Sequence, residues 1–101
     1  MADLLCLNLL CPLPAQERVQ DALLTLLDMA VFVSSPAYAH GFSHAALTTS
    51  EQVSGRSDAA LVQVLVPAAR LDALLVQLQP ELARTGVSYW ATTVARQGEF
   101  Q

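Results

Sequence analysis

Two spacings of apolar residues alternate along the chain and predict strands and helices in turn. Residues 4–10 form a short apolar run that Pro12 ends, which favours a strand over a helix. From Pro14, which suits the first turn of a helix, valine and leucine residues recur at helical spacing as far as Asp28. The β-branched and aromatic residues 30–34 then predict a second strand.

The second half of the chain follows the same order. Residues 60–66 are β-branched and apolar, which predicts a third strand, and Pro67 opens a second helix with a leucine stripe. A break or kink in this helix is expected near Gln79, because Pro80 cannot continue an undisturbed helix. Gly86 is a suitable C-terminal cap, and residues 87–95 predict the fourth strand.

The two halves also share a short repeat. The tetrapeptide Asp-Ala-Leu-Leu occurs at residues 21–24 and again at residues 72–75, each a short way after a proline that ends a strand. This placement supports a duplicated βαβ unit. We therefore predict one α+β domain over residues 1–101, with a ferredoxin-like βαββαβ order, a four-stranded antiparallel sheet and two helices on one face.

Residues 35–57 lie between the two halves and have the composition of a loop. This stretch holds Pro36, Gly41 and Gly55 among many serines and threonines. A structureless connection of this length is uncommon in a compact domain, so we expect a functional excursion. Alternatively, part of the stretch extends the two neighbouring strands as a hairpin.

The strand residues indicate that both faces of the sheet are buried. With helices on one face, every second strand residue of a monomer should be polar. Hydrophobic residues instead make up 53% of the chain and charged residues only 14%, against about a quarter in a usual domain. The second face is therefore predicted to pack against other subunits. In the first strand, Leu5, Leu7 and Leu9 are apolar on one face and Leu4, Cys6 and Leu10 on the other. In the third strand, Val62, Val64 and Val66 are apolar on one face and Leu61 and Leu65 on the other.

The charge of the chain argues against nucleic acids and anionic membranes as partners. The formal net charge is -4, and the five basic residues are arginines scattered along the sequence, whereas a phosphate-backbone binder needs a clustered basic face. The first residues lack the basic segment of a signal peptide, so we expect a cytosolic protein. Cys6 and Cys11 are then expected to be reduced thiols, and their odd spacing places them on opposite faces of a strand.

His40 and His44 form a candidate metal site. On a helix this spacing puts both imidazoles on one face, where they can bind a divalent metal. Pro36 and Gly41 argue against a helix here, although the two side chains can still converge with Glu51 in a loop. The alternative is that both histidines are ordinary polar loop residues, because a third ligand is not evident.

The segment at residues 51–56 is a candidate effector site. Gly55 permits an unusual backbone conformation, and Arg56 offers a planar fork of donors suited to a carboxylate or phosphate. The alternative is a solvated loop with a contact between Glu51 and Arg56 inside a hairpin. The candidate residues are Glu51, Gln52, Gly55 and Arg56.

Tyr89 and Trp90 are neighbours on the last predicted strand and therefore point to opposite faces. One is expected in the core and the other at a subunit contact. The sequence contains no Gly-x-Ser-x-Gly motif and no lysine at all, and no cysteine is paired with a nearby histidine. We expect a binding protein rather than an enzyme, and the sequence does not identify a cofactor.

These residues together resemble the PII-like proteins of unknown function that are encoded beside heavy-metal efflux pumps of the resistance-nodulation-division class. The resemblance covers nearly the whole chain, and its specific part is the Glu-Gln-Val-x-Gly-Arg pattern at residues 51–56. The other matching positions are His40-Gly41, His44, residues 47–50 and Tyr89-Trp90.

The resemblance implies a homotrimer with the sheets inside and the helices outside. It also implies a long loop that senses a small anion or metal effector in the clefts between subunits, and a membrane efflux transporter as partner. One departure argues against ordinary ATP binding: residues 83–86 replace the Gly- and Lys-rich loop of nucleotide-binding PII proteins and contain no lysine. Arg56, Arg84 and Arg96 are still able to bind another anion.

Two alternative functions stay open. The chain is more distantly similar to CutA proteins, which implies a divalent-metal-binding protein with His40 and His44 as ligands. A small cofactor-free enzyme of the dimeric ferredoxin-like kind is the other alternative, and the lack of an evident acid–base pair counts against it.

Overall fold

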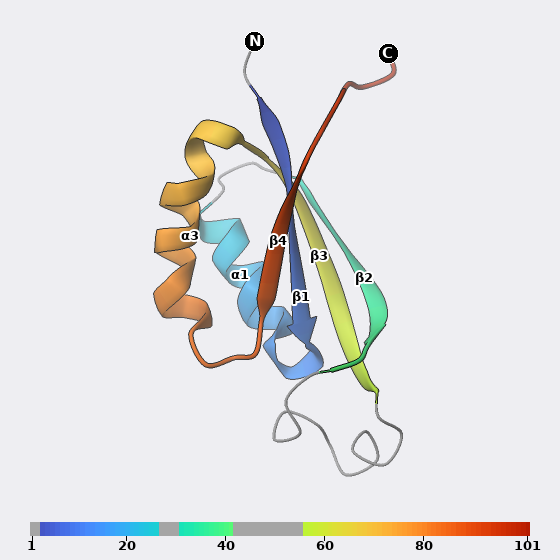
Figure 1. Cartoon of the computed structure of the whole chain (residues 1–101), viewed down its shortest axis with the longest axis vertical. Coiled ribbons are helices and arrows are strands. Elements are labelled where there is room, and N and C mark those ends of the chain that lie inside the picture. The colour runs from blue at the N-terminus through green and yellow to red at the C-terminus, as the bar shows by residue number, and fades with distance from the viewer. Residues whose placement is uncertain (1–2, 27–30, 42–55) are drawn as a thin grey trace.

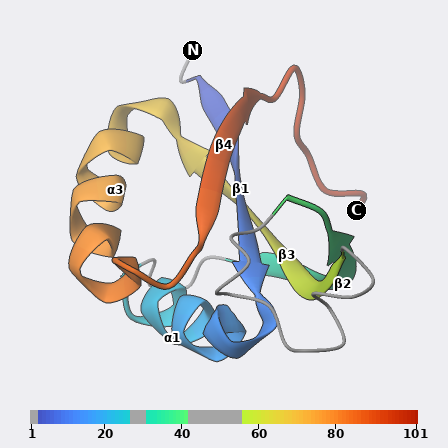
Figure 2. The same cartoon turned by 60° about the horizontal axis from the view of Figure 1, so that its bottom comes forward.

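The computed structural model describes residues 3–26, 31–41 and 56–101 and has the predicted α+β architecture. The four strands form one antiparallel sheet, and both α-helices lie on the same side of it (Figure 1, Figure 2). The ferredoxin-like prediction is therefore confirmed. The elements are β1 (Leu4–Pro12), the 3-10 turn η1 (Leu13–Ala15), α1 (Gln16–Leu26), β2 (Phe32–Ala39), β3 (Ser57–Pro67), α3 (Ala68–Leu82) and β4 (Ser88–Thr93).

Strands β1 and β3 occupy the centre of the sheet, whose order is β2-β3-β1-β4. Leu7 pairs with Val64 and Leu9 with Val62, and none of these four side chains is more than 2% exposed. Each central strand has a neighbour on both edges, so its alternate residues on the helix side are sealed between sheet and helices. The other two strands, β2 and β4, form the edges of the sheet.

The hydrophobic core fills the layer between the sheet and the two helices. Each helix turns one leucine of the repeated tetrapeptide into this layer: Leu23 of α1 is 0% exposed and Leu74 of α3 is 3% exposed. Leu24, the next residue of α1, is 63% exposed, as the helical period requires. The two halves of the chain are therefore equivalent at this position. Other buried residues of the core are Cys11, Val19, Ala22, Val66 and Leu78.

The stretch between the halves is not a loop throughout, because strands occupy both of its ends. Strand β2 continues to Ala39 and strand β3 already begins at Ser57, so the hairpin alternative is correct for these parts. Pro36 lies inside β2 opposite Ala60. A proline is tolerated there because β2 is an edge strand, where one row of backbone groups has no ladder partner. Residues 42–55 lie outside the part of the chain that the structure describes.

Of the break or kink expected near Gln79, the break does not occur, because α3 continues through Pro80 to Leu82. A proline removes the hydrogen bond to the carbonyl group four residues earlier, which here belongs to Val76. Val76 is 73% exposed, so water can replace the missing donor. Pro80 also lies in the last turn, where little of the helix remains to be disturbed.

A tight turn over residues 82–85 leads from α3 toward β4. Ala83 has φ -57° and ψ 135°, and Arg84 has φ 65°, which is the pattern of a type II turn. The backbone N–H of Thr85 donates to the Leu82 carbonyl at 3.2 Å, and the Thr85 hydroxyl donates to the same oxygen at 2.6 Å. The third position of such a turn favours glycine, and a side chain there costs about 1–2 kcal/mol.

We expect Gly86→Ala to lower the free energy of unfolding by about 1–3 kcal/mol. Gly86 has φ 82°, and a Cβ atom there would lie 3.1 Å from Cγ of Pro12. Urea unfolding measures the effect, and Gly98→Ala is the matched control because a Cβ at that position meets nothing within 4 Å. Equal stability of the two variants would contradict this account of the turn.

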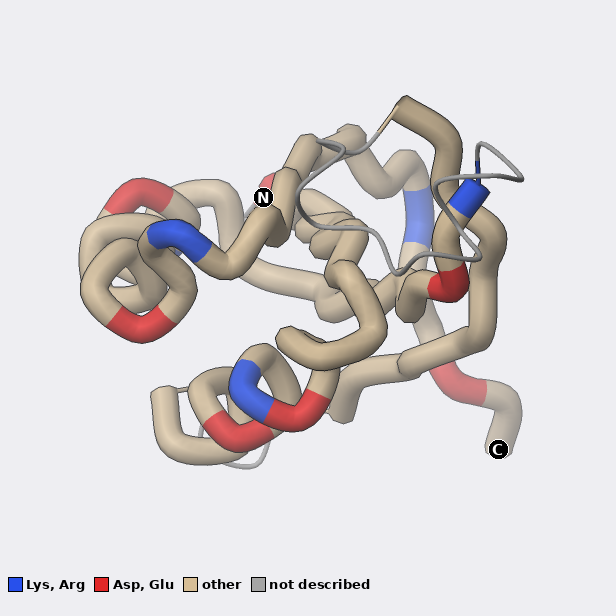
Figure 3. The backbone as a smooth tube through the Cα atoms, turned by 90° about the horizontal axis from the view of Figure 1, so that it is seen from below, with Lys and Arg blue, Asp and Glu red and all other residues tan. Residues whose placement is uncertain are grey.

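The charged residues of the described parts lie on the two helices and at the ends of the sheet, away from its centre (Figure 3). Strand β1 carries no charged residue, and β3 carries only Asp58, near its start. The face of the sheet away from the helices is therefore uncharged along most of both central strands. None of the helices in the described parts of the chain is long and apolar enough to cross a membrane.

Candidate functional site

The β2–β3 ladder ends at the pair Ala39 and Ser57. The next residues outward are His40 and Arg56, two of the predicted site residues, and the pairing register brings them to the same end of the hairpin. This end of the sheet is opposite the end that carries the chain termini (Figure 1). The other predicted site residues lie outside the described residues: His44, Glu51, Gln52 and Gly55.

Arg56 is held over an aromatic ring. Its guanidinium carbon lies 4.4 Å from the centroid of the Tyr38 ring. Tyr38 pairs with Asp58, so Arg56 is its diagonal neighbour on the hairpin. Both side chains are exposed, and a cation over a ring at such a site gains about 0.5–1 kcal/mol. This contact favours one orientation of the planar fork of donors, which suits recognition of a carboxylate or phosphate.

The sequence analysis missed Tyr38, because it placed this residue in a loop. The available signal was its position two residues before His40. Once strand β2 is extended through Pro36, the alternation of side chains puts positions 38 and 40 on the same side. The contact with Arg56 follows from this extension.

Ser57 adds a buried hydroxyl group to this end of the hairpin. The residue is 3% exposed, and its Oγ has no hydrogen-bond partner among the described residues. A buried polar group without a partner costs about 1–3 kcal/mol. For metal binding, residues 3–26, 31–41 and 56–101 hold no group of three or more His, Cys, Asp or Glu side chains.

The sheet face away from the helices is here called the uncovered face. Val33, Leu65 and Trp90 on this face are 58%, 40% and 45% exposed. In β1 and β3 both the odd-numbered and the even-numbered positions carry apolar residues. The register shows that these two sets lie on opposite faces of the sheet. The residues of the uncovered face are Leu4, Cys6, Asn8 and Leu10 of β1, Val33, Ser35 and Ala37 of β2, Ala59, Leu61, Gln63 and Leu65 of β3, and Ser88, Trp90 and Thr92 of β4.

The polar side chains at the centre of the uncovered face are bonded within the chain. Nε2 of Gln63 donates to Oδ1 of Asn8 at 2.9 Å, and Nδ2 of Asn8 donates to the Cys6 and Trp90 carbonyl oxygens at 3.1 and 3.4 Å. Asn8 is 4% exposed. Apolar surface can therefore cover this face without leaving the Asn8 amide unbonded.

The expectation for the aromatic pair is half correct. Tyr89 pairs with Leu9 and Trp90 with Asn8, so the two rings lie on opposite faces. Neither is in the core, because Tyr89 is 56% exposed and Trp90 is 45% exposed. The reason is that β4 is an edge strand, with β1 as its neighbour on one side only.

Both cysteines are free thiols on opposite faces of β1, as the spacing predicted. Cys6 is half-buried on the uncovered face, and Cys11 is fully buried in the core. Burial raises the pKa of the Cys11 thiol from 9.0 to about 11, because the apolar surroundings disfavour the thiolate. Cys11 therefore stays protonated at neutral pH and acts as a packing residue.

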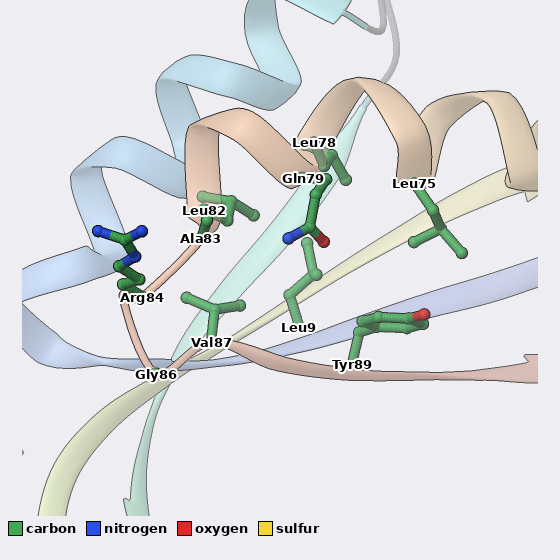
Figure 4. Close-up of a pocket in the computed structure, with 10 residues that line it drawn as sticks. All are labelled: Leu9, Leu75, Leu78, Gln79, Leu82, Ala83, Arg84, Gly86, Val87 and Tyr89. Carbon is green, nitrogen blue, oxygen red and sulfur yellow. The ribbon is translucent and has the colours of Figure 1, made fainter.

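A cavity of about 210 Å³ lies between the C-terminal part of α3 and the start of β4. In Figure 4 the leucines of α3 face Leu9 of β1, Tyr89 of β4 and Val87 just before β4, and Arg84 lies at one end. The sequence analysis did not find this cavity, because its walls come from three elements. The lining residues are Leu9, Leu75, Leu78, Gln79, Leu82, Ala83, Arg84, Gly86, Val87 and Tyr89.

The sheet order, the two helices on one face and the long β2–β3 hairpin define a PII- and CutA-like α+β domain. The family model described as "Protein of unknown function (DUF3240)" matches residues 1–101, and the chain belongs to this family.

Comparison with solved structures supports the fold at low sequence identity. A DUF3240 family protein from Shewanella baltica OS155 superposes with a TM-score of 0.79 at 18% identity, over 100% of both chains. The periplasmic divalent cation tolerance protein CutA from Archaeoglobus fulgidus gives 0.68 at 13% identity, over 95% of this chain and 88% of CutA. Arabidopsis thaliana PII bound to citrate gives 0.63 at 13%, over 92% of this chain and 78% of PII. No curated protein matches by sequence.

Proposed function

We propose that the protein is a PII-like homotrimeric regulator that binds a small anion or a divalent metal and controls a heavy-metal efflux transporter. The observation that carries the proposal is the uncovered face. Its exposed residues Val33, Leu65 and Trp90 form the kind of apolar surface that marks a protein–protein contact. Three copies packed through this face would bury it and leave the charged helices in water.

The hydrogen bonds of the uncovered face support this assembly. Burying an amide costs free energy unless it is bonded, and Asn8 and Gln63 already bond each other at 2.9 Å. The hydroxyl of Ser57, at the end of the hairpin, has no hydrogen-bond partner among the described residues. The face therefore has the chemistry of a subunit interface rather than that of a solvated surface.

The effector is proposed to bind at the end of the β2–β3 hairpin. Arg56, held over Tyr38, and the neighbouring His40 offer donors to an anion. Citrate in the structure of Arabidopsis PII is a carboxylate held by a protein of this fold, and carboxylates suit a guanidinium fork. Glu51, Gln52 and Gly55 are proposed to complete the site.

A CutA-like metal protein is the second candidate, and the position of His40 favours it. His40 lies at the exposed tip of the described hairpin, where His44 and Glu51 could join it as ligands for a divalent metal. The Archaeoglobus CutA, a divalent cation tolerance protein, has this fold. Metal and anion are therefore tested side by side.

A regulator fits the described residues better than a catalyst does. His40 and Arg56 are both donors to an anion, and the Cys11 thiol is held protonated in the core. We propose a cytosolic location, where the thiols of Cys6 and Cys11 would be kept reduced. A cytosolic trimer of this kind would meet the cytosolic side of its transporter.

Thermal unfolding in the presence of Zn²⁺, inorganic phosphate, citrate or ATP tests the effector site. A ligand present at 100 times its Kd stabilises the folded form by about 2.7 kcal/mol. Replacing both His40 and His44 by Ala is expected to abolish a shift caused by Zn²⁺ and to leave an anion shift. Arg56→Ala is expected to do the reverse, with Arg70→Ala on the exposed side of α3 as the matched control.

Light scattering coupled to size exclusion at micromolar concentration tests the assembly itself. A mass of three chains is the expected result. A folded monomer would overturn the trimeric regulator, and the absence of any thermal shift with all four ligands would overturn the sensing role.

A further inference from the structure

Two apolar features of the chain lie at opposite ends of β4. The cavity beside α3 opens at the start of the strand, where Val87 and Tyr89 line it. Phe100 follows the other end of the strand and is fully exposed, at 105% of its reference surface. One feature is a hollow that is walled by leucines and also lined by Gln79 and Arg84, and the other is an exposed aromatic ring.

The cavity has room for a phenyl ring. Its volume is about 210 Å³, and an apolar cavity of about 150 Å³ is enough to hold benzene. Leu75, Leu78 and Leu82 form one wall and Leu9 lies opposite them (Figure 4). The Tyr89 ring at the side offers an aromatic neighbour for stacked or edge-to-face packing.

The tail does not reach the cavity of its own chain. The backbone N–H of Val94 donates to the Leu4 carbonyl at 3.1 Å, which ties the chain to β1 as far as this residue. Tyr89 lies five residues back, about 17 Å along the strand, and the tail runs on past the end of β4 (Figure 1). The six residues from Val94 to Phe100 span about 20 Å when fully extended, so reaching the cavity of the same chain would require the tail to turn straight back along β4.

The charge beside the cavity is opposite in sign to the charge next to Phe100. Arg84 is the charged residue among those that line the cavity, and Glu99 directly precedes Phe100 in the chain. Arg84 has φ 65° in a turn position that favours glycine, and such strain is often retained where the side chain has a use. A Phe100 ring seated in the cavity would bring the Glu99 carboxylate to this guanidinium.

We propose that Phe100 of one copy seats in the cavity between α3 and β4 of the next copy, with Glu99 beside Arg84. Each chain has one tail and one cavity, so the contact is head-to-tail, and such contacts close into a ring when the rotation permits. The inference rests on the proposed trimer and identifies the segment that links neighbouring subunits.

Disulfide cross-linking between two differently tagged chains tests this contact. Cys6→Ser and Cys11→Val remove the natural thiols from both chains. One chain then carries Phe100→Cys and the other carries Gln79→Cys, which lines the cavity on the exposed side of α3. The matched control replaces Gln79→Cys by Gln77→Cys, on the same helix and exposed but outside the cavity.

The expected result is a mixed cross-linked pair with Gln79→Cys and at least about tenfold less with Gln77→Cys. A trimer by light scattering with no cross-link, or with equal cross-links at both positions, would overturn the tail contact and leave the proposed function standing. A monomer by light scattering would instead remove the trimer on which both depend. A cross-link that forms only within a single chain carrying both cysteines would also overturn the contact.

A second measurement keeps the natural cysteines. Phe100→Ala is expected to weaken trimer association about tenfold or more, since large aromatic residues dominate such contacts. Phe100→Leu, which keeps an apolar side chain, is expected to recover most of the loss. Trimer association unchanged in Phe100→Ala would overturn the contact even if the cysteine variants fail to fold.

Discussion

Leu65→Asp is expected to convert the proposed trimer into folded monomers. Leu65 lies on the uncovered face of the central strand β3, and 40% of it is exposed in the single chain, so a monomer can hydrate an aspartate there. In the trimer the same carboxylate would be buried without a partner, which costs several kcal/mol per ion. Each 1.4 kcal/mol weakens association tenfold, so we expect the dissociation constant to rise by about 100-fold or more.

Leu24→Asp is the control for this experiment. It is the same substitution on the opposite side of the molecule, at a leucine of α1 that is 63% exposed. Light scattering at micromolar concentration should give three chains for Leu24→Asp and one for Leu65→Asp, with circular dichroism reporting a folded chain in both. A stable Leu65→Asp trimer would mean that the uncovered face is not the subunit contact.

The fold and the two-sided apolar character of the central strands were predictable from local patterns. Strand β1 carries Leu7 and Leu9 toward the helices and Cys6 and Leu10 toward the other face, and this alternation can be read without a structure. The repeated tetrapeptide likewise identified equivalent helices, since Leu23 is buried in α1 as Leu74 is in α3. The spacing of apolar residues and the repeated tetrapeptide can both be read from the order of residues alone, so they are predictable without a structure.

The errors arise where a local rule depends on tertiary position. The composition around Pro36 predicts a loop, yet an edge strand tolerates this proline. Pro80 predicts a break or kink in α3, yet the carbonyl that loses its donor belongs to an exposed turn. Neither the edge position of β2 nor the exposure of Val76 can be derived from the residues around each proline.

The sequence predicts only part of the candidate site, because the rest depends on tertiary position. His40 and Arg56 were predicted from composition, and the pairing of Ala39 with Ser57 brings them to one end of the hairpin. The stacking of Arg56 on Tyr38 required the correct strand length. The cavity beside α3 required the packing of a helix on two strands, which no local pattern describes.

Leu23→Ala is expected to lower the free energy of unfolding by about 2–5 kcal/mol. Leu23 is 0% exposed and belongs to the core between α1 and the sheet, so truncation removes buried surface and leaves a cavity. A domain of this size has a total stability of about 5–15 kcal/mol, so the loss is a large fraction of the total. Urea unfolding measures it.

Leu24→Ala makes the same chemical change one residue further along the same helix. Leu24 is 63% exposed, so the loss there should stay within about 0.5 kcal/mol. Urea unfolding must be compared at one protein concentration, because association stabilises the folded chain by mass action. Similar losses in the two variants would mean that assembly buries the outer face of α1 as well, which would contradict a trimer packed through the sheet alone.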